Sequence, residues 1–151
     1  MTKVLFVCLG NICRSAMAQG VLEKKALSLG LPIEVDSAGT SSYHIGEAPD
    51  KRMQVKAQEY NIDISNQRAR QFTANDFEQF DYIFAMDSSN YRNIVALANS
   101  EADKQKVSLF LNYTHPNQEK SVPDPYFGGE EGFEEVYHLL DHACDVFLKA
   151  L

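Results

Sequence analysis

One stretch near the N-terminus, residues 4–15, most constrains how this chain can fold. An apolar, β-prone run ends at Cys8, a loop of small residues follows, and Ser15 begins a segment with helical spacing. A strand that leads through a loop to a helix N-terminus directs backbone N–H groups at a bound anion. Cys8 and Arg14 bracket this loop, so both can face one oxyanion. The stretch predicts a loop that binds a phosphate group and attacks it, because arginine presents a planar fork to phosphate oxygens and a thiol in a positive field ionises readily.

A simpler explanation of Cys8 is a cysteine buried in an apolar strand, and an isolated C-x5-R match also occurs by chance. The surroundings favour the functional interpretation, since Gly10 and Asn11 lie within the loop and Ser15 behind it can cap a helix. A nucleotide-binding P-loop is excluded because the sequence contains no G-x-x-x-x-G-K-S/T motif.

The length and charge of the chain narrow the classes of protein it can belong to. Its 151 residues suit one domain, residues 1–151, with a core of its own. A net charge of −7 argues against non-specific nucleic-acid binding, so any anion site has to be built locally. The apolar run at residues 4–9 is too short for a signal or membrane segment. Three cysteines, an odd number, favour a reducing compartment and therefore the cytoplasm. A monomer without membrane partners is expected.

Strand and helix patterns alternate along the chain. After the strand that ends at Cys8, further strands are expected at residues 33–35, 82–86 and 107–111, and residues 36–42 read as turn-rich. Helices are expected at residues 15–29, 50–60, 87–98 and 130–150, with a helical turn or two at 73–80. This alternation predicts an α/β fold with a parallel sheet covered on both faces and a ligand site beyond the carboxyl ends of the strands.

Two motifs give the sequence a family resemblance. Residues 8–15, CLGNICRS, and residues 124–127, DPYF, resemble the two signature motifs of the low-molecular-weight protein tyrosine phosphatases. Segments between them are also similar to the family, so the resemblance covers essentially the whole chain. It implies a four-stranded parallel sheet in the flavodoxin-like order 2-1-3-4. It also implies a hydrolase that removes phosphate from phosphotyrosine-containing proteins, with inorganic phosphate as product and competitive ligand.

The resemblance assigns roles to the residues of both motifs. Cys8 is expected to attack phosphorus and form a cysteinyl-phosphate, and Asp124 to act as general acid and then general base. Without the family, Asp124 between two prolines would be read as a simple turn signal. No cofactor is expected, and no cluster of metal ligands occurs in the sequence. Arg14 and the backbone amides of the phosphate-binding loop are expected to hold the phosphate oxygens; this loop is Leu9, Gly10, Asn11, Ile12, Cys13, Arg14 and Ser15.

Further residues are expected to support this loop or line the cleft. In the family, residues at the positions of Asn11, Ser15 and Ser37 support the loop through hydrogen bonds, although Ser15 and Ser37 also suit simple caps or turns. The resemblance places Tyr43, Tyr126 and Phe127 at the substrate lip, with ordinary surface or core packing nearly as good an explanation of Phe127. Cys13 matches a thiol that can trap oxidised Cys8 as a disulfide, or it is a small buried hydrophobe. Cys144, on an apolar helical face, reads as core.

Three other functions compete with the phosphotyrosine phosphatase. An arsenate reductase on the same scaffold needs a cysteine pair in the middle of the chain, and residues 14–143 contain no such pair. A protein-arginine phosphatase has a similar loop with threonine where Ile12 stands. A non-catalytic phosphotyrosine-binding module would not need Cys8, Arg14 and Asp124 together. One departure from the family is Gln67, which stands where many members have histidine.

Overall fold

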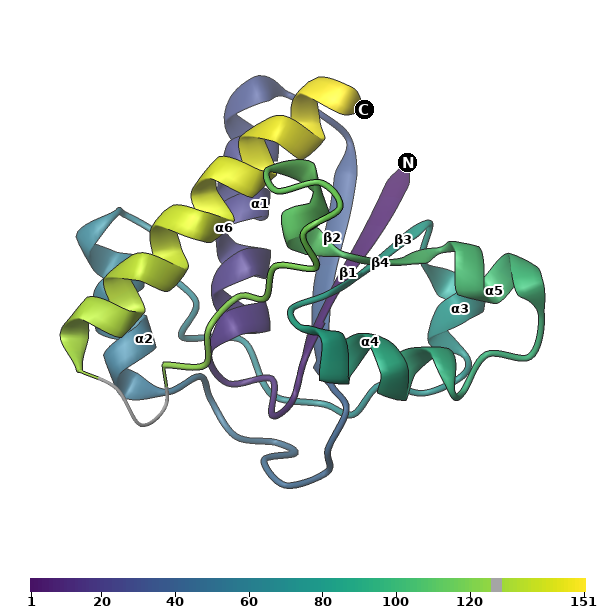
Figure 1. Ribbon diagram of the computed structural model, residues 1–151. Coiled ribbons are helices and arrows are strands. Elements are labelled where there is room, and N and C mark those ends of the chain that lie inside the picture. The colour runs from purple at the N-terminus through teal and green to yellow at the C-terminus, as the bar shows by residue number, and fades with distance from the viewer. Residues whose placement is uncertain (126–128) are drawn as a thin grey trace.

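A four-stranded parallel sheet forms the centre of the protein. The computed structural model describes residues 1–125 and 129–151. The strands pair in the order β2-β1-β3-β4, and all three pairs are parallel, which confirms the predicted fold class and strand order. Figure 1 shows the sheet running through the middle of the molecule. The strands are β1 (Thr2–Cys8), β2 (Ile33–Gly39), β3 (Tyr82–Ala85) and β4 (Val107–Leu109).

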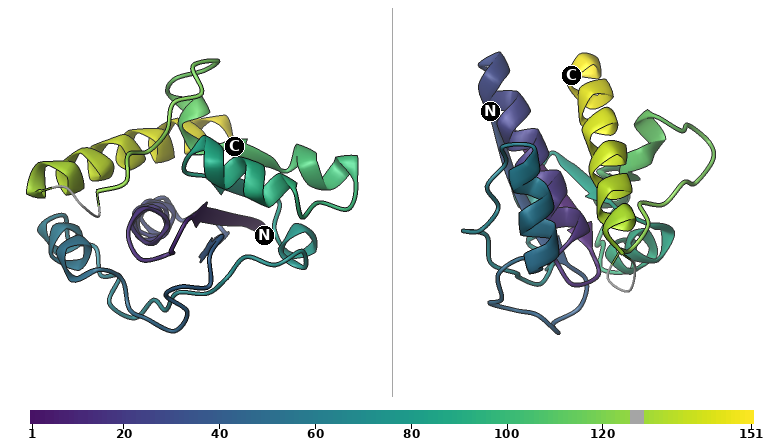
Figure 2. Two further views of the ribbon diagram at one scale, coloured as in Figure 1. Left: turned by 60° about the horizontal axis from the view of Figure 1, so that its bottom comes forward. Right: turned by 90° about the vertical axis from the view of Figure 1, so that its left-hand side faces the viewer.

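Helices cover both faces of this sheet. In Figures 1 and 2, α1, α2 and α6 lie on one side, while α3, α4 and α5 lie on the other. The helical segments are α1 (Arg14–Leu29), α2 (Lys51–Glu59), α3 (Asp76–Gln79), α4 (Ser88–Val95), α5 (Glu101–Gln105), the 3-10 turn η1 (Phe110–Tyr113) and α6 (Glu130–Ala150).

The central strand β1 separates two hydrophobic cores because successive side chains of a strand point to opposite faces. Val4, Phe6 and Cys8 belong to the larger core, which also contains the buried faces of α1 and α6. Leu5 and Val7 belong to the smaller core beneath α3 and α4. β1 is therefore buried from both sides, and its carboxyl end holds Cys8 in a rigid position.

The described structure differs from the sequence prediction in several boundaries. β2 continues to Gly39, so the turn-rich segment expected from residue 36 is wrong for residues 36–39. Over these residues the strand stays paired with β1, and the last pair is Cys8 with Gly39. β4 ends at Leu109, and the chain then turns into η1. The helix expected over residues 87–98 ends at Val95. Helix α5 was not predicted, although Ser100 caps it by accepting a hydrogen bond from the Asp103 N–H at 3.1 Å.

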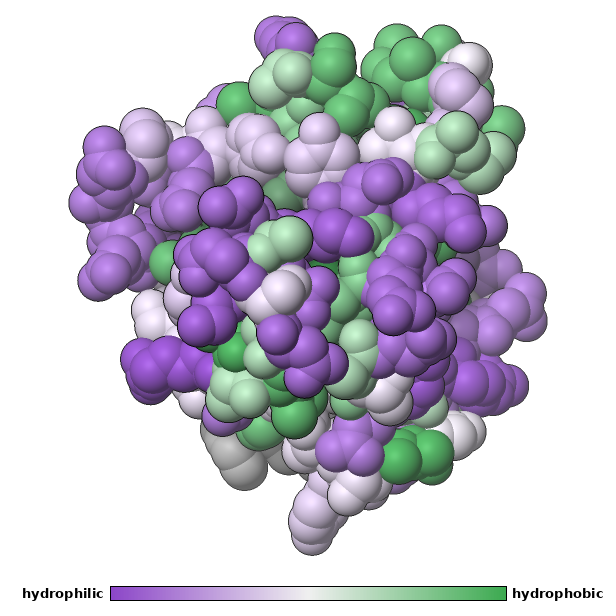
Figure 3. Space-filling model, turned by 90° about the vertical axis from the view of Figure 1, so that its right-hand side faces the viewer, coloured by the Kyte–Doolittle hydropathy of each residue, from purple (hydrophilic) through white to green (hydrophobic). Residues whose placement is uncertain are grey.

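The surface over α3, α4 and α5 is largely hydrophilic, with apolar groups gathered toward its upper and lower edges (Figure 3). On the opposite side, α6 packs along α1 and has the apolar stripe that its sequence predicts. Its buried residues include Phe133, Val136, Leu140, Cys144 and Phe147. Among the described residues, no helix has both the length and the apolar composition needed to cross a membrane.

Candidate active site

A cavity of about 450 Å³ lies at the carboxyl end of β1. The left view of Figure 2 looks toward this end of the molecule, where the loops after β1 and β2 gather. The cavity brings Cys8 and Arg14 together with Asp124, which follows them by more than a hundred residues in the sequence. The remaining lining residues are Leu9, Gly10, Ile12, Cys13, Ser41, Tyr43 and His44.

Two hydrogen-bond donors converge on the sulfur of Cys8, which is only 3% exposed. The Asn11 backbone N–H donates to Cys8 Sγ at 3.2 Å, and the Ser15 hydroxyl lies 3.0 Å from the same sulfur. The Ser15 oxygen already accepts a hydrogen bond from Asn11 Nδ2 at 2.8 Å, so its own proton can point to Cys8. This is the environment that a thiolate nucleophile requires.

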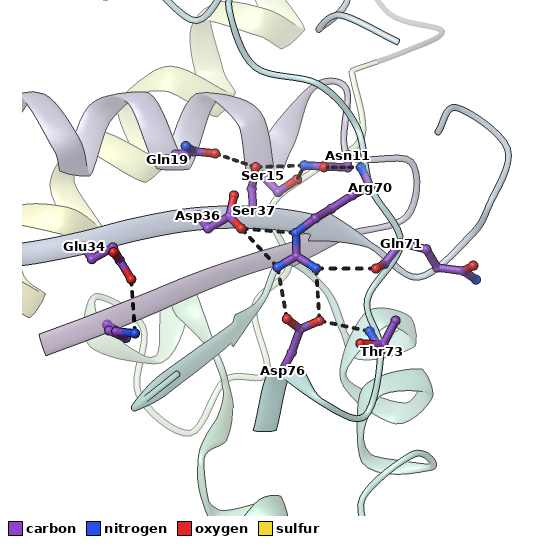
Figure 4. A network of polar contacts seen from close by, with 11 residues as sticks. Asn11, Ser15, Gln19, Glu34, Asp36, Ser37, Arg70, Gln71, Thr73 and Asp76 are labelled. Atoms are coloured by element: carbon purple, nitrogen blue, oxygen red, sulfur yellow. Dashed lines mark hydrogen bonds and ion pairs between the residues drawn. The ribbon is translucent and has the colours of Figure 1, made fainter. Parts of the chain in front are cut away.

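Asn11 connects the loop to the structure behind it. Its backbone has φ 60°, the left-handed conformation that asparagine tolerates better than most residues. Its Nδ2 also donates to Ser37 Oγ at 2.9 Å, while its Oδ1 accepts from the Arg70 backbone N–H at 3.1 Å (Figure 4). Ser37 in turn donates to Gln19 Oε1 at 2.6 Å. The structure thus brings the three residues expected to support the loop into one hydrogen-bond network.

Ser15 does not cap α1, so that part of the prediction is wrong. The helix already begins at Arg14, and its N-cap residue, Cys13, makes no side-chain capping hydrogen bond. Ser15 instead lies in the first helical turn, fully buried, with its hydroxyl turned toward Cys8 and Asn11. A helix that starts without a side-chain cap leaves its first N–H groups available to an anion in the loop.

Arg14 is held from behind by the main chain and by a carboxylate. Arg14 is 4% exposed, and its Nη1 donates to Asp87 Oδ2 at 2.7 Å and to the Val122 carbonyl at 3.1 Å. Its Nη2 lies 4.0 Å from Asp124 Oδ2. Burial opposes the charge of Arg14, but the charges of Cys8, Asp87 and Asp124 outweigh burial and raise its pKa. Arg14 is therefore a permanent cation on the wall of the cavity.

The segment that carries Asp124 is fixed just before this residue. The Val122 N–H donates at 2.7 Å to the carbonyl of Met86, directly after β3, and the Val122 carbonyl accepts from Arg14. Asp124 then reaches the edge of the cavity with its side chain about half exposed. A carboxyl group with access to both solvent and the cavity can exchange protons with a ligand and with water.

The lip of the cavity combines apolar and polar side chains. Tyr43 is 85% exposed and lines the cavity, whereas Tyr126 and Phe127 lie outside the described residues. Ile12 is only 9% exposed, because most of its side chain packs into the larger core.

His44 and Ser41 also line the cavity, and sequence reasoning missed both. His44 Nδ1 lies 3.0 Å from Glu47 Oε2, and the ring packs over Gly10, where an added Cβ would come within 2.9 Å of His44 Cδ2. The sequence offered only one indication that they belong to the site, which is their position shortly after β2, at the carboxyl edge of the sheet.

Cys13 lines the cavity and is buried. Burial raises the pKa of its thiol, and the negative charges of Asp50 and Cys8 add to this effect. Cys13 is therefore protonated near neutral pH while the Cys8 thiol is intact. Cys144 is completely buried in α6, as the sequence predicts, and burial raises the pKa of its thiol as well.

Comparisons with known proteins agree with this geometry. The family model described as "Low molecular weight phosphotyrosine protein phosphatase" matches residues 3–151. The chain is 43% identical over 157 residues to the low molecular weight phosphotyrosine protein phosphatase of Schizosaccharomyces pombe, covering 100% of this chain and 99% of that protein. It is 42% identical over 150 residues to the human protein of the same name, covering 97% of this chain and 94% of that protein.

Solved structures show the same fold. A protein tyrosine phosphatase from Entamoeba histolytica with Hepes in the active site has a TM-score of 0.92 and 39% identity, covering 99% of this chain and 96% of that chain. A Drosophila arginine phosphatase has a TM-score of 0.92 and 35% identity, covering 99% and 97%. With the family model, the relatives and the shared fold in agreement over the whole chain, this protein belongs to the low molecular weight phosphotyrosine protein phosphatase family.

Proposed function

We propose that this protein is a protein tyrosine phosphatase that hydrolyses phosphotyrosine monoesters through a cysteinyl-phosphate intermediate. The observation that carries the proposal is the meeting of Cys8, Arg14 and Asp124 around one cavity, with two donors directed at the Cys8 sulfur. The names of the relatives support the same activity.

In the first step, Cys8 attacks the phosphorus atom as a thiolate. The S–P bond forms while the bond from phosphorus to the tyrosine oxygen breaks, and the protonated Asp124 gives its proton to the departing phenolate. Arg14 and the loop N–H groups hold the equatorial oxygens, whose charge must be stabilised throughout the transfer. The pairing of Arg14 with Asp87 and with the Val122 carbonyl fixes the guanidinium before substrate arrives.

In the second step, water attacks the phosphorus of the cysteinyl-phosphate. Asp124, now a carboxylate, accepts a proton from this water, the S–P bond breaks, and the Cys8 thiolate returns with release of inorganic phosphate. Ser15 supports this leaving group, because its hydroxyl at 3.0 Å stabilises the negative sulfur as it forms. Inorganic phosphate fits the same loop and is expected to inhibit competitively.

An aromatic substrate suits the walls of the cavity better than a guanidinium does. Tyr43 and the small exposed part of Ile12 offer apolar surface to a phenyl ring in the cavity. Phosphoarginine, the substrate class suggested by the Drosophila neighbour, has a planar polar group that the Ile12 methyl groups cannot hydrogen-bond. Leaving such a donor unpaired in a closed site costs about 1–3 kcal/mol, or roughly a ten- to hundredfold preference for phosphotyrosine.

Turnover on a panel of phosphotyrosine, phosphoserine, phosphoarginine and arsenate tests this proposal. We expect phosphotyrosine to be preferred, Cys8→Ser to abolish turnover while phosphate binding persists, and Ile12→Thr to shift the ratio toward phosphoarginine. Turnover of Cys8→Ser near the wild-type rate would remove Cys8 as nucleophile. Wild-type hydrolysis of phosphoarginine as fast as phosphotyrosine would contradict the substrate assignment.

The proposal includes a cytoplasmic, monomeric and redox-sensitive enzyme. All three cysteines are free thiols, and a nucleophilic thiol needs a reducing compartment to remain active. Cys13 lines the same cavity as Cys8 and can trap a sulfenic acid on Cys8 as a disulfide, which cellular thiols then reduce.

A further inference from the structure

A short segment around Arg70 lies directly behind the phosphate-binding loop. The Gly39 N–H at the end of β2 donates to the Arg70 carbonyl at 2.8 Å, and the Phe72 N–H donates to the Gly39 carbonyl at 2.7 Å. These bonds attach the segment to the sheet edge as an isolated parallel bridge between Gly39 and Gln71. The Arg70 N–H then donates to Asn11 Oδ1 at 3.1 Å.

The side chain of Arg70 fixes the same segment from the other direction. Its Nη1 and Nη2 donate to the two oxygens of Asp76 at 3.1 Å each, and its Nε donates to Asp36 Oδ2 at 3.1 Å (Figure 4). Asp36 belongs to β2, while Asp76 is buried at the start of α3 and also accepts from the Thr73 N–H at 2.9 Å. One guanidinium thereby joins two elements that are separated in the sequence.

These contacts form a continuous chain from α3 to the reactive sulfur. The two Asp76 oxygens hold the Arg70 guanidinium, the Arg70 backbone holds the Asn11 side chain, and the Asn11 N–H donates to Cys8 Sγ. Since Asn11 adopts a left-handed conformation, its orientation depends on the partners of its side chain. A shift of Arg70 is therefore transmitted to the N–H that faces the sulfur.

We propose that Arg70 is a positioning residue that holds the phosphate-binding loop in its anion-binding conformation, acting through Asn11 and touching neither substrate nor phosphate. This role rests on the proposed function of the loop. It requires the arginine fork and not merely a positive charge, because the two Asp76 oxygens and Asp36 are engaged by three different nitrogens. Lysine would keep the charge but lose this geometry.

The test compares Arg70→Met and Arg70→Lys with the wild type. The matched control is Lys25→Met, because Lys25 Nζ also pairs with two carboxylates, Asp141 and Asp145, at 2.8 Å each, but on the packed faces of α1 and α6. The measurements are kcat, KM, the inhibition constant of inorganic phosphate, the rate of Cys8 alkylation by iodoacetate, and urea unfolding.

For Arg70→Met we expect about a tenfold lower kcat, about tenfold weaker phosphate inhibition and slower alkylation. A tenfold change corresponds to the loss of about one charge-assisted hydrogen bond. Arg70→Lys should recover only part of each loss. Lys25→Met should lower the free energy of unfolding without moving phosphate inhibition or alkylation. Asp36→Asn, which removes one acceptor on a half-exposed side chain, provides a milder variant should Arg70→Met fail to fold.

The outcomes separate this role from the proposed function. Wild-type alkylation that phosphate does not slow would overturn the phosphate-binding loop itself and the role of Arg70 with it. Phosphate protection in the wild type, combined with unchanged kcat and phosphate inhibition in Arg70→Met, would overturn the role of Arg70 alone. A full rescue by Arg70→Lys would overturn the requirement for the fork.

Discussion

Asn11 is the residue at which removal of one small side chain should change both stability and catalysis. Its amide group makes three hydrogen bonds, donating to Ser15 and Ser37 and accepting from the Arg70 N–H. Its backbone adopts φ 60° and directs its own N–H to Cys8. Replacing Asn11 by glycine removes the three side-chain bonds and leaves the left-handed backbone unstrained.

The size of the effect follows from these contacts. In Asn11→Gly the Arg70 N–H loses its buried acceptor, which costs about 1–3 kcal/mol, and two further hydrogen bonds contribute about 1 kcal/mol each. We therefore expect the free energy of unfolding to fall by about 3–5 kcal/mol. Asn11→Ala should be less stable than Asn11→Gly by up to about 1 kcal/mol. Alanine is strained in the left-handed conformation, whereas glycine loses more conformational entropy when the chain folds. The strain of alanine is only slightly the larger of these two costs. If the N–H that faces Cys8 moves by about 1 Å, kcat should fall about a hundredfold.

Urea unfolding and steady-state kinetics on an aryl phosphate test this prediction. Asn61 is a matched control, because it also has a left-handed backbone, at φ 61°, but is exposed and lies outside the cavity. Asn61→Gly should leave kcat unchanged and change the free energy of unfolding by less than about 0.5 kcal/mol. If Asn11→Gly keeps wild-type kcat and stability, the network does not position the loop and the reasoning fails.

Three other measurements address separate groups. Asp124→Asn should slow aryl phosphates with poor leaving groups more than those with good ones, since only the former need a proton; equal slowing would indicate a structural role. Peroxide should inactivate the wild type reversibly but Cys13→Ser irreversibly, and equal recovery with dithiothreitol would exclude Cys13 as the resolving thiol. Hydrogen bonds from Lys56 and Tyr60 lower the pKa of Glu134 from 4.5 to about 2, so its stabilising effect is present above pH 4.5 and is lost as the pH falls toward 2. As the pH falls over this range, the melting temperature should accordingly decline less in Glu134→Gln than in the wild type. Parallel plots of melting temperature against pH for the two proteins would contradict the lowered pKa of Glu134.

Much of the fold follows from local patterns that were visible in the sequence. The apolar run around Phe6 predicts a strand buried on both faces, and the spacing of Phe133, Val136 and Phe147 predicts the buried face of α6. The end of β2 was misjudged because Asp36 and Ser37 are poor strand formers when considered alone. Pairing along β1 overrides that preference, and local propensity cannot include a partner strand from elsewhere in the chain.

The cavity was predictable only in part. Cys8, Arg14 and Asp124 lie in motifs with specific spacing, whereas His44 enters the cavity because its loop folds back over Gly10. Gln67 donates to the Ala16 carbonyl at 3.0 Å, a contact that no spacing rule predicts. Such contacts depend on the relative placement of distant segments and become visible only in three dimensions.

The acidic character of the chain is compatible with an anion site because several carboxylates near the loop, though not Asp124 at the cavity edge, are paired with cations behind it. Asp87 holds Arg14 from one side, and Asp36 and Asp76 hold Arg70 behind the loop, so these negative charges fix the positive groups in place. At physiological salt the remaining surface charges are screened beyond about 8 Å, whereas a phosphate bound as proposed would lie within hydrogen-bond distance of its donors. Under the proposed function, the preference for an anion is therefore set by a few directed N–H groups and one buried guanidinium. A net charge of −7 should then slow the approach of phosphorylated proteins more than it weakens their binding.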